Sequence, residues 1–409
     1  MKNIFRNIGP GTLVAAAFIG PGTLTVCTLA GVQFGFTLLW AMGLSIVATL
    51  VLQEMAMRLG LVYGKGLAHT IKDQISNKIV KVLALMLILS AIVVGNAAYE
   101  AGNISGGVLG VETFVSNATT TMMGLQVNYL SLIVGGIAFI LLYIGNYKII
   151  ERVLIVLVIL MSLSFIITAW LTNPDFSEVL KGLFIPEIPE EGFLMILGLV
   201  GTTVVPYNLF LHAAIVKEKW QDKSQLKAAK IDSYISIILG GLVSMAIIVC
   251  AAAIQGTSIE NAADLAKGIE PLYGSFSKYI LSLGLFAAGI TSAITAPLAA
   301  AYVANECFGW KPSLKSYRFR IVWMTILFLG IIISSIGYKP IEVIKFAQIA
   351  NGILLPVIVG FLLWVVNRKG VLGSNTNSIF QNVIGVVIFI TTIILGLRSL
   401  EKVFQFSIF

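Results

Sequence analysis

The sequence has few of the charged residues on which soluble proteins depend. Charged residues make up 11% of its 409 positions, whereas apolar residues make up 58%. An ordinary globular domain has roughly 25% charged and 45–50% apolar residues, so this composition excludes one. Apolar runs recur along almost the whole length, and each reaches the roughly 18 residues that a helix needs to cross a bilayer. We predict an all-α membrane protein with about eleven transmembrane helices.

Cysteine is also scarce. Cys27, Cys250 and Cys307 are far apart, which argues against a disulfide framework and a zinc site. The net charge of +8 comes without a basic run interleaved with aromatic residues, so we expect no nucleic-acid partner. The sequence has no recognisable nucleophile–base set or nucleotide-binding loop, which argues against an enzyme. We expect no cofactor and no resident metal.

The predicted spans form two groups of five and one further helix within a single transmembrane domain. Residues 8–172 hold the first group, residues 192–366 the second, and residues 379–399 the extra helix. To within several residues, the predicted spans are 8–35, 38–60, 79–106, 127–147, 150–172, 192–216, 232–255, 276–305, 319–337, 341–366 and 379–399.

The basic residues fall mainly on one side of this arrangement. With a cytoplasmic N-terminus, about 20 of the 27 lysines and arginines lie in cytoplasmic segments, the asymmetry typical of membrane proteins. The loop at residues 175–191 is acidic and falls on the opposite side. This pattern predicts a multi-pass protein of the plasma membrane, with the N-terminus inside and, after an odd number of spans, the C-terminus outside.

Two predicted spans are interrupted in corresponding places. The first span contains the segment 20–23, Gly-Pro-Gly-Thr, and the sixth contains the segment 204–208, Val-Val-Pro-Tyr-Asn. Proline lacks an amide proton and clashes with the preceding turn, and glycine leaves helical dihedrals at little steric cost. Matching breaks in two halves are typical of transporters that hold their substrate between inverted repeats. The alternative is a pair of proline kinks that only shape packing.

At these breaks the sequence resembles the Nramp family of divalent-metal transporters, a branch of the amino acid–polyamine–organocation superfamily. Gly9-Pro10-Gly11 leads to the first break as in that family, and residues 201–212 are similar to its Met-Pro-His-Asn-Leu-x-Leu-His segment. Residues 53–61 and 291–295 are also similar. The resemblance implies a LeuT-like fold, in which two inverted five-helix repeats with broken helices 1 and 6 are followed by one extra C-terminal helix.

The sequence departs from the family at the metal site. Gly20, Thr23 and Val205 stand where the family has aspartate, asparagine and methionine ligands, and Tyr207 replaces a histidine. A dehydrated divalent cation needs anionic oxygen or soft sulfur ligands. We therefore expect a secondary active transporter, working by alternating access, for a small polar organic solute such as an amino acid. The alternative is a transporter of Mn²⁺ or Mg²⁺, coupled to protons or uncoupled. A channel is disfavoured, because no charged ring or filter-like repeat is present.

The breaks and the resemblance together give the expected substrate site. Its residues surround the two breaks and include one position on the tenth span: Gly20, Pro21, Gly22, Thr23, Thr202, Val205, Tyr207, Asn208 and Gln348. Thr23 could instead cap a half-helix, and Tyr207 could simply pack. The sequence leaves the oligomeric state open, and a monomer would suffice.

A second group of residues is expected to couple transport to an ion. Glu100 lies within the third span, where burying a charge is costly, and is the expected proton carrier. The resemblance places Asn103 where the family has a second acid, and His212 at a family histidine that could relay a proton. Thr291 and Ser292 would complete a sodium site if Na⁺ replaced H⁺. A purely structural role in hydrogen bonding or helix packing is the alternative for Glu100, His212, Thr291 and Ser292.

Overall fold

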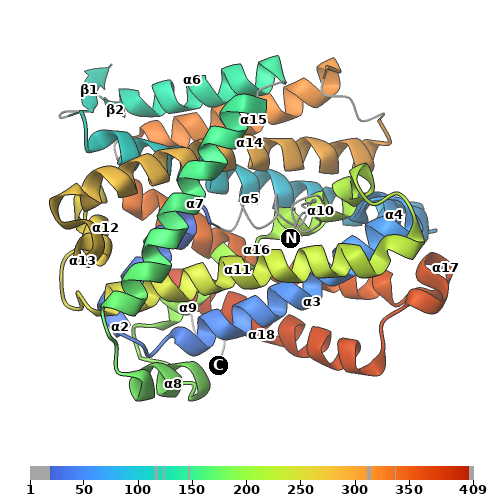
Figure 1. Ribbon diagram of the computed structural model, residues 1–409. Coiled ribbons are helices and arrows are strands. Elements are labelled where there is room, and N and C mark those ends of the chain that lie inside the picture. Colours follow the sequence, from blue (N-terminus) through green and yellow to red (C-terminus); the bar gives the residue numbers. More distant parts are fainter. Residues whose placement is uncertain are drawn as a thin grey trace.

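The computed structural model describes residues 19–404, except 116–117, 123–124, 146–147, 311–314 and 337. Nearly all of these residues are helical, so the predicted all-α architecture is confirmed (Figure 1). The helices are α2 (Pro21–Phe34), α3 (Leu39–Tyr63), α4 (Leu67–Gln74), α5 (Lys78–Glu112), α6 (Tyr129–Ile144), α7 (Lys148–Leu171), α8 (Phe176–Phe184), α9 (Phe193–Thr203), α10 (Pro206–Ile215), α11 (Leu226–Ala252), α12 (Ala262–Ala266), α13 (Glu270–Tyr273), α14 (Ser277–Phe308), α15 (Tyr317–Ser335), α16 (Pro340–Val366), α17 (Lys369–Leu372) and α18 (Ile379–Phe404).

The long helices match the predicted spans. Nine helical segments of the described chain are long and apolar enough to cross a membrane, and α6 is a shorter apolar helix. The first predicted span is described only from residue 19, so its earlier part, with Gly9, Pro10 and Gly11, lies outside the described residues. The boundaries of the two five-helix groups, residues 8–172 and 192–366, stay a prediction.

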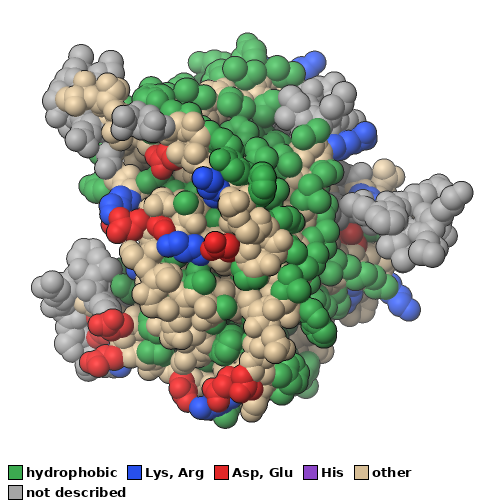
Figure 2. All heavy atoms as spheres, turned by 60° about the vertical axis from the view of Figure 1, so that its left-hand side comes forward, with side chains coloured by type: hydrophobic (Ala, Val, Ile, Leu, Met, Phe, Trp, Pro, Cys, Tyr) green, Lys and Arg blue, Asp and Glu red, His purple; other side chains and the backbone are tan. Residues whose placement is uncertain are grey.

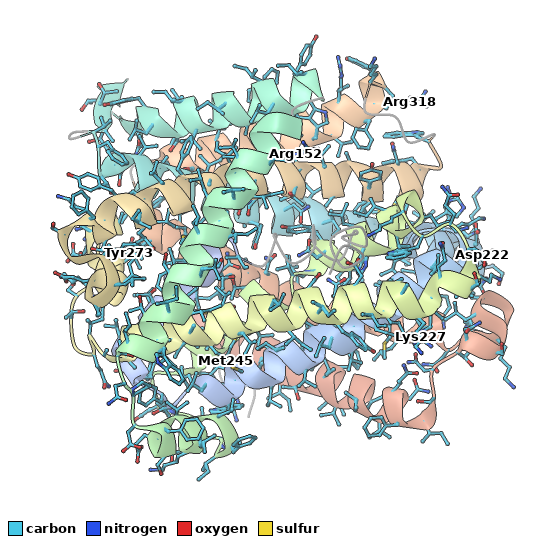
Figure 3. The ribbon with its side chains drawn as sticks, viewed as in Figure 1. Arg152, Asp222, Lys227, Met245, Tyr273 and Arg318 are labelled. Atoms are coloured by element: carbon cyan, nitrogen blue, oxygen red, sulfur yellow. The ribbon has the colours of Figure 1, made fainter. Side chains whose placement is uncertain are left out.

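The connecting segments gather at the two ends of the bundle. One end carries the short helices α8, α12 and α13, and the other carries α4 and α17 (Figure 1). We call the first the acidic end, because Asp and Glu side chains collect on it (Figure 2). We call the second the basic end, because the basic residues Lys227 and Arg318 lie there, whereas Tyr273 lies at the acidic end (Figure 3).

A two-stranded hairpin at the acidic end was not predicted. Strand β1 (Thr119–Met122) pairs antiparallel with β2 (Leu125–Asn128), in a register that sets Thr119 opposite Asn128. Asn128 then caps α6, because its side-chain oxygen accepts from the amide of Leu130 at 3.0 Å. The strands are only four residues long, which gives too short an alternation to be recognised in an apolar sequence.

Small residues allow the central helices to approach closely. A Cβ atom added at Gly289 of α14 would lie 2.5 Å from the backbone nitrogen of Gly107 in α5. Such contacts between glycines are typical of helix packing in membranes, where dispersion contacts replace the hydrophobic effect. The result is a tightly packed centre against which α2, α9 and α10 are held.

Candidate functional site

The start of α2 coincides with the first predicted break, and the part of that span before residue 19 lies outside the described residues. Gly20 has extended dihedrals, φ −95° and ψ 178°, and α2 begins at Pro21. Proline suits the first position of a helix, because the amide it lacks would have no partner there. The helix therefore begins inside the apolar segment, and its N-terminal end, with a positive partial charge, lies within the bundle.

The second break separates α9 from α10. Helix α9 ends at Thr203, Val204 has φ −93° and ψ 73°, and Val205 has φ −76° and ψ 118°. Helix α10 then begins at Pro206. Both valine side chains are buried. Two consecutive non-helical residues interrupt the backbone ladder, so the predicted break in span six is also confirmed.

Tertiary packing brings the two breaks together. The hydroxyl oxygens of Thr23 in α2 and Thr202 in α9 lie 2.9 Å apart, although 179 residues separate them in sequence. Thr23 thus contacts the other broken helix, and no side chain caps α2 at Gly20. Both threonines were predicted for the substrate site, but nothing in the sequence predicts their contact.

Gln348 of α16 lies between the broken helices. A Cβ atom added at Gly22 would lie 2.2 Å from Nε2 of Gln348, and one added at Gly201 would lie 1.9 Å from its backbone oxygen. Only glycine leaves room for these approaches. The contacts place Gln348, one of the residues predicted for the substrate site, beside both breaks.

Several buried polar atoms around the breaks lack partners. In the described part of the chain, no hydrogen bond reaches Oε1 of Gln348, either side-chain amide atom of Asn208, or Nδ2 of Asn351. All three residues are at most 1% exposed. Because leaving a buried polar atom unpaired costs free energy, such atoms usually bind water or a ligand. Asn351 lies one turn from Gln348 and was missed, although it is also an isolated amide in an apolar span.

Strong metal ligands are absent from the described site. Gly20 has no side chain, and the Val205 side chain is purely apolar. Among the described residues, no group of three or more His, Cys, Asp or Glu side chains could hold a metal ion. The site therefore offers neutral oxygen and nitrogen atoms.

Glu100 is buried in α5 next to the site. Its Oε2 accepts a 3.3 Å hydrogen bond from Asn103, so the two predicted coupling residues are in contact. Gly330 of α15 packs against it, since a Cβ atom there would lie 2.4 Å from Cγ of Glu100. The preceding residue, Tyr99, meets the ring of Tyr207 edge-on, with ring centroids 5.3 Å apart. One aromatic contact thus links the helix of Glu100 to the second break.

His212 joins three helices. Its Nδ1 lies 2.9 Å from Oε1 of Gln53 in α3, and its Nε2 lies 3.4 Å from Oγ of Ser233 in α11. An amide oxygen can only accept, so Nδ1 carries the proton in the neutral ring and Nε2 accepts from the serine. Gln53 was missed as a partner, although a buried amide in span two was visible in the sequence.

The two predicted sodium-site residues differ in their contacts. The hydroxyl of Thr291 donates to its own helix, at 2.9 Å from the carbonyl oxygen of Ala287. The hydroxyl of Ser292 is buried and has no hydrogen-bond partner in the described ranges. Their role in ion binding stays a prediction.

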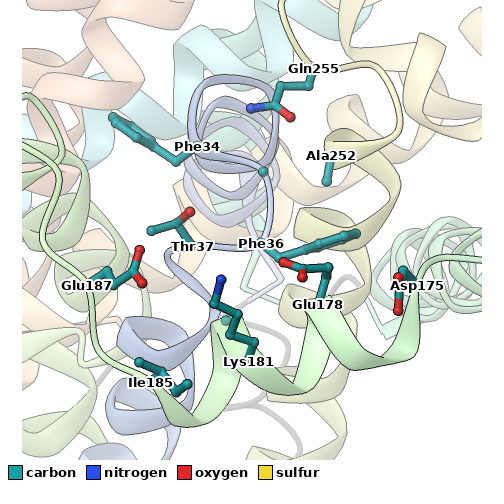
Figure 4. Close-up of a pocket in the computed structure, with 12 residues that line it drawn as sticks. Phe34, Phe36, Thr37, Asp175, Glu178, Lys181, Ile185, Glu187, Ala252 and Gln255 are labelled. Atoms are coloured by element: carbon teal, nitrogen blue, oxygen red, sulfur yellow. The ribbon is translucent and has the colours of Figure 1, made fainter.

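A separate cavity of about 290 Å³ lies at the acidic end, between α2, α8 and α11. Lys181 points into it, with Glu178 and Glu187 to either side (Figure 4). Its lining reaches Phe34 at the end of α2, which is twelve residues, or about 18 Å of helix, from Gly22. The cavity is therefore distinct from the site at the breaks.

Comparison with known proteins identifies the family. Residues 11–401 match the Nramp family, described as natural resistance-associated macrophage protein-like. The chain belongs to the Nramp family. The resemblance seen at the two breaks is thereby confirmed over nearly the whole sequence, and the protein is a multi-pass membrane transporter.

Curated relatives in the Nramp family align over almost their full length. The divalent metal cation transporter MntH of Staphylococcus aureus is 28% identical over 428 residues, which covers 97% of this chain and 91% of the relative. MntH of Caldanaerobacter subterraneus subsp. tengcongensis is 24% identical over 400 residues, covering 95% and 91%.

Solved structures confirm the LeuT-like fold. A manganese transporter of Eremococcus coleocola has a TM-score of 0.76 at 20% identity and covers 96% of this Nramp chain and 86% of its own. Mhp1, a nucleobase-cation-symport-1 family transporter in a closed conformation, has a TM-score of 0.55 at 13% identity, with 98% and 94% covered. At these identities the likeness shows the fold alone.

Proposed function

We propose that this Nramp-family protein is a secondary active transporter of a divalent metal cation, Mg²⁺ or Mn²⁺, that works by alternating access. The proposal rests on the curated relatives, which are named as divalent metal cation transporters and align with nearly the whole chain. They favour the cation over the organic solute that the residues at the metal-ligand positions led us to expect.

One observation carries the proposal on the structural side. Beside the two breaks, Oε1 of Gln348 and Oδ1 of Asn208 are buried and have no hydrogen-bond partner among the described residues. Mg²⁺ dehydrates reluctantly and commonly keeps several waters when it binds protein oxygens. In this proposal Gln348 and Asn208 hold such a hydrated ion, with the hydroxyls of Thr23 and Thr202 nearby. Because these ligands are neutral, binding is weaker than at a site with carboxylate and thioether ligands.

Alternating access follows from the broken helices. Half-helices that end mid-membrane can tilt separately about the unwound residues, and the substrate stays between them. The contact between Thr23 and Thr202 joins the two broken helices directly, at 2.9 Å. Movement of either broken helix would therefore alter the site.

Glu100 is the proposed proton carrier. It is a buried carboxyl group whose helix contacts the second break through Tyr99 and Tyr207. The sodium alternative rests on Ser292, whose buried hydroxyl has no partner among the described residues. For the whole chain, the basic end is proposed to face the cytoplasm, which gives an inner N-terminus and an outer C-terminus in the plasma membrane.

A small polar organic solute is the second candidate. It is favoured by Gly20 and Val205, which leave the site without a carboxylate or thioether. A glycine-rich break could bind a substrate carboxylate through backbone amides at the start of α2. Neutral amides such as Asn208 would then orient the solute.

Uptake into proteoliposomes distinguishes the two candidates. We expect saturable uptake of Mg²⁺ or Mn²⁺, with half-saturation above the micromolar range, that is not inhibited by amino acids. The double variant Gly20→Asp/Val205→Met should bind Mn²⁺ more tightly, because it supplies an anionic oxygen and a sulfur ligand. Glu100→Gln in the same vesicles should abolish the pH dependence of uptake. Saturable amino-acid uptake without metal uptake would instead establish the organic solute.

A further inference from the structure

A groove runs between α5, α16 and α18 on the flank of the bundle near the basic end. Its two adjoining parts have volumes of about 660 and 530 Å³ and share Gly360, Trp364 and Phe389 in their linings. Both volumes fall within the roughly 300–1,000 Å³ of small-molecule sites. The groove is separate from the site at the breaks, because none of the predicted substrate-site residues lines it.

The walls of the groove are apolar and belong to membrane-spanning helices. Val80, Leu83 and Leu87 come from the first turns of α5, and Val386 and Phe389 come from α18. Leu83 is 59% exposed and Val386 is 48% exposed. Side chains so exposed on spanning helices face acyl chains in a bilayer, so the occupant of the groove comes from the lipid phase.

The sequence of α16 explains the hollow. Pro356 lies inside this helix and removes one backbone hydrogen bond, which bends helices. One turn later, Gly360 has no side chain, and a Cβ atom there would lie 3.1 Å from Cε2 of Phe389. From Pro356 to Trp364 the groove follows α16 for eight residues, or about 12 Å.

The rim towards the basic end carries positive charge. Arg368 lines the groove and lies over the ring of Trp364, 4.8 Å from the ring centroid. Lys369 follows it, and Lys78 and Lys81 lie in the first turn of α5. In the described part of the chain, no ion pair reaches these four cations. Asp73, an acidic residue that precedes α5, forms an ion pair with Lys65, whose Nζ lies 2.6 Å from Oδ2 of the aspartate.

We propose that this groove binds one anionic phospholipid of the leaflet at the basic end. An acyl chain lies along Gly360 between α5 and α18, and the phosphate lies against Arg368 and Lys369. Basic pockets between transmembrane helices on the cytoplasmic side suit anionic head groups, and tryptophan favours the depth at which the head groups begin. In this proposal the lipid packs against α16, the helix that also carries Gln348.

Native mass spectrometry of the full chain in detergent tests the head-group contact. The probes are phosphatidylglycerol and phosphatidylcholine with the same acyl chains. We expect tighter binding of one phosphatidylglycerol, and a loss of that preference on the order of tenfold in Arg368→Ala/Lys369→Ala. The control is Lys223→Ala/Lys227→Ala, which removes the same charge from the same end outside the groove and should keep the preference.

A second variant tests the acyl-chain contact. Gly360→Leu fills the hollow and should lower the binding of phosphatidylglycerol. Leu83→Trp also fills the hollow. Because Leu83 is exposed, this variant replaces Gly360→Leu in the test if the glycine variant elutes as aggregate. The proposal is overturned if phosphatidylglycerol binding survives in both the arginine–lysine and the groove-filling variants. It is also overturned if phosphatidylcholine binds equally tightly to the unaltered chain.

Discussion

This transporter has two buried polar regions, one with charged side chains and one with uncharged side chains. At the basic end, Glu54 and Arg58 of α3 form an ion pair at 3.2 Å, with side chains 2% and 4% exposed. Lys230 of α11 reaches the same carboxylate at 2.7 Å. Around the breaks, by contrast, the polar side chains of Gln348 and Asn208 are uncharged, and in the described ranges Oε1 of Gln348 and both amide atoms of Asn208 have no hydrogen-bond partner.

We infer a structural role for the charged region and a binding role for the uncharged region. The guanidinium of Arg58 also donates to the backbone oxygen of Asn375 and to Asn377, and Gln381 donates to Glu54. This charged cluster therefore ties α3 and α11 to the segment that leads into α18. Both carboxylate oxygens of Glu54 and both terminal nitrogens of Arg58 have partners in the fold, whereas Oε1 of Gln348 has none in the described part of the chain. Free energy of folding should depend on the first region, and transport on the second.

The largest expected effect is on stability, in Arg58→Met. Breaking a buried ion pair leaves an uncompensated charge and typically costs about 3–5 kcal/mol. Lys230 still neutralises Glu54 in part, so we expect the lower end of that range. Thermal unfolding in detergent measures the loss, and uptake per folded molecule should be unchanged. Lys227→Met, an exposed lysine one turn before Lys230, is the control. A Tm equal to that of the control would contradict a structural role for the cluster.

The next effect should appear in transport, in Gln348→Leu. Loss of one polar ligand costs roughly 1–3 kcal/mol of binding, or about fivefold to 150-fold in affinity. Stability should be unchanged or higher, because an unpaired buried oxygen is removed. The matched control is Gln381→Leu, which makes the same chemical change in the charged cluster and should lower Tm but not substrate affinity. Unaltered uptake kinetics in Gln348→Leu would place the substrate elsewhere.

The two regions also differ in how far the sequence could predict them. The breaks were predicted because Pro21 and Pro206 act on the backbone locally. Glu54 and Arg58 are four residues apart on one helix, a spacing that by itself favours an ion pair. The approach of Gln348 to Gly22 depends on packing between distant helices, so only similarity to a family selected that glutamine. Substrate identity could not be predicted, because neutral oxygens suit both a hydrated cation and a polar solute.

The smallest effect is expected where an ion pair is exposed. Lys339, next to α16, donates to Glu260 at 2.8 Å, and the two side chains are 61% and 58% exposed. This hydrogen bond and the lysine charge hold the pKa of Glu260 below its ordinary value of 4.5. Because the pKa is lowered in the folded protein, the pair stabilises the fold above that ordinary value. The contribution is lost as the pH falls through the lowered pKa.

Lys339→Gln should therefore lower Tm only slightly at pH 7, because solvent screens exposed pairs. The difference from the unaltered chain should shrink towards zero as the pH falls from the ordinary pKa through the lowered one, because Glu260 is then protonated in both. Thermal unfolding across this pH range measures it. Lys278→Gln, at an exposed lysine in the first turn of α14 with no ion pair in the described ranges, should show no such pH-dependent difference. A Tm loss as large as that of Arg58→Met would show that burial is not what distinguishes the two ion pairs.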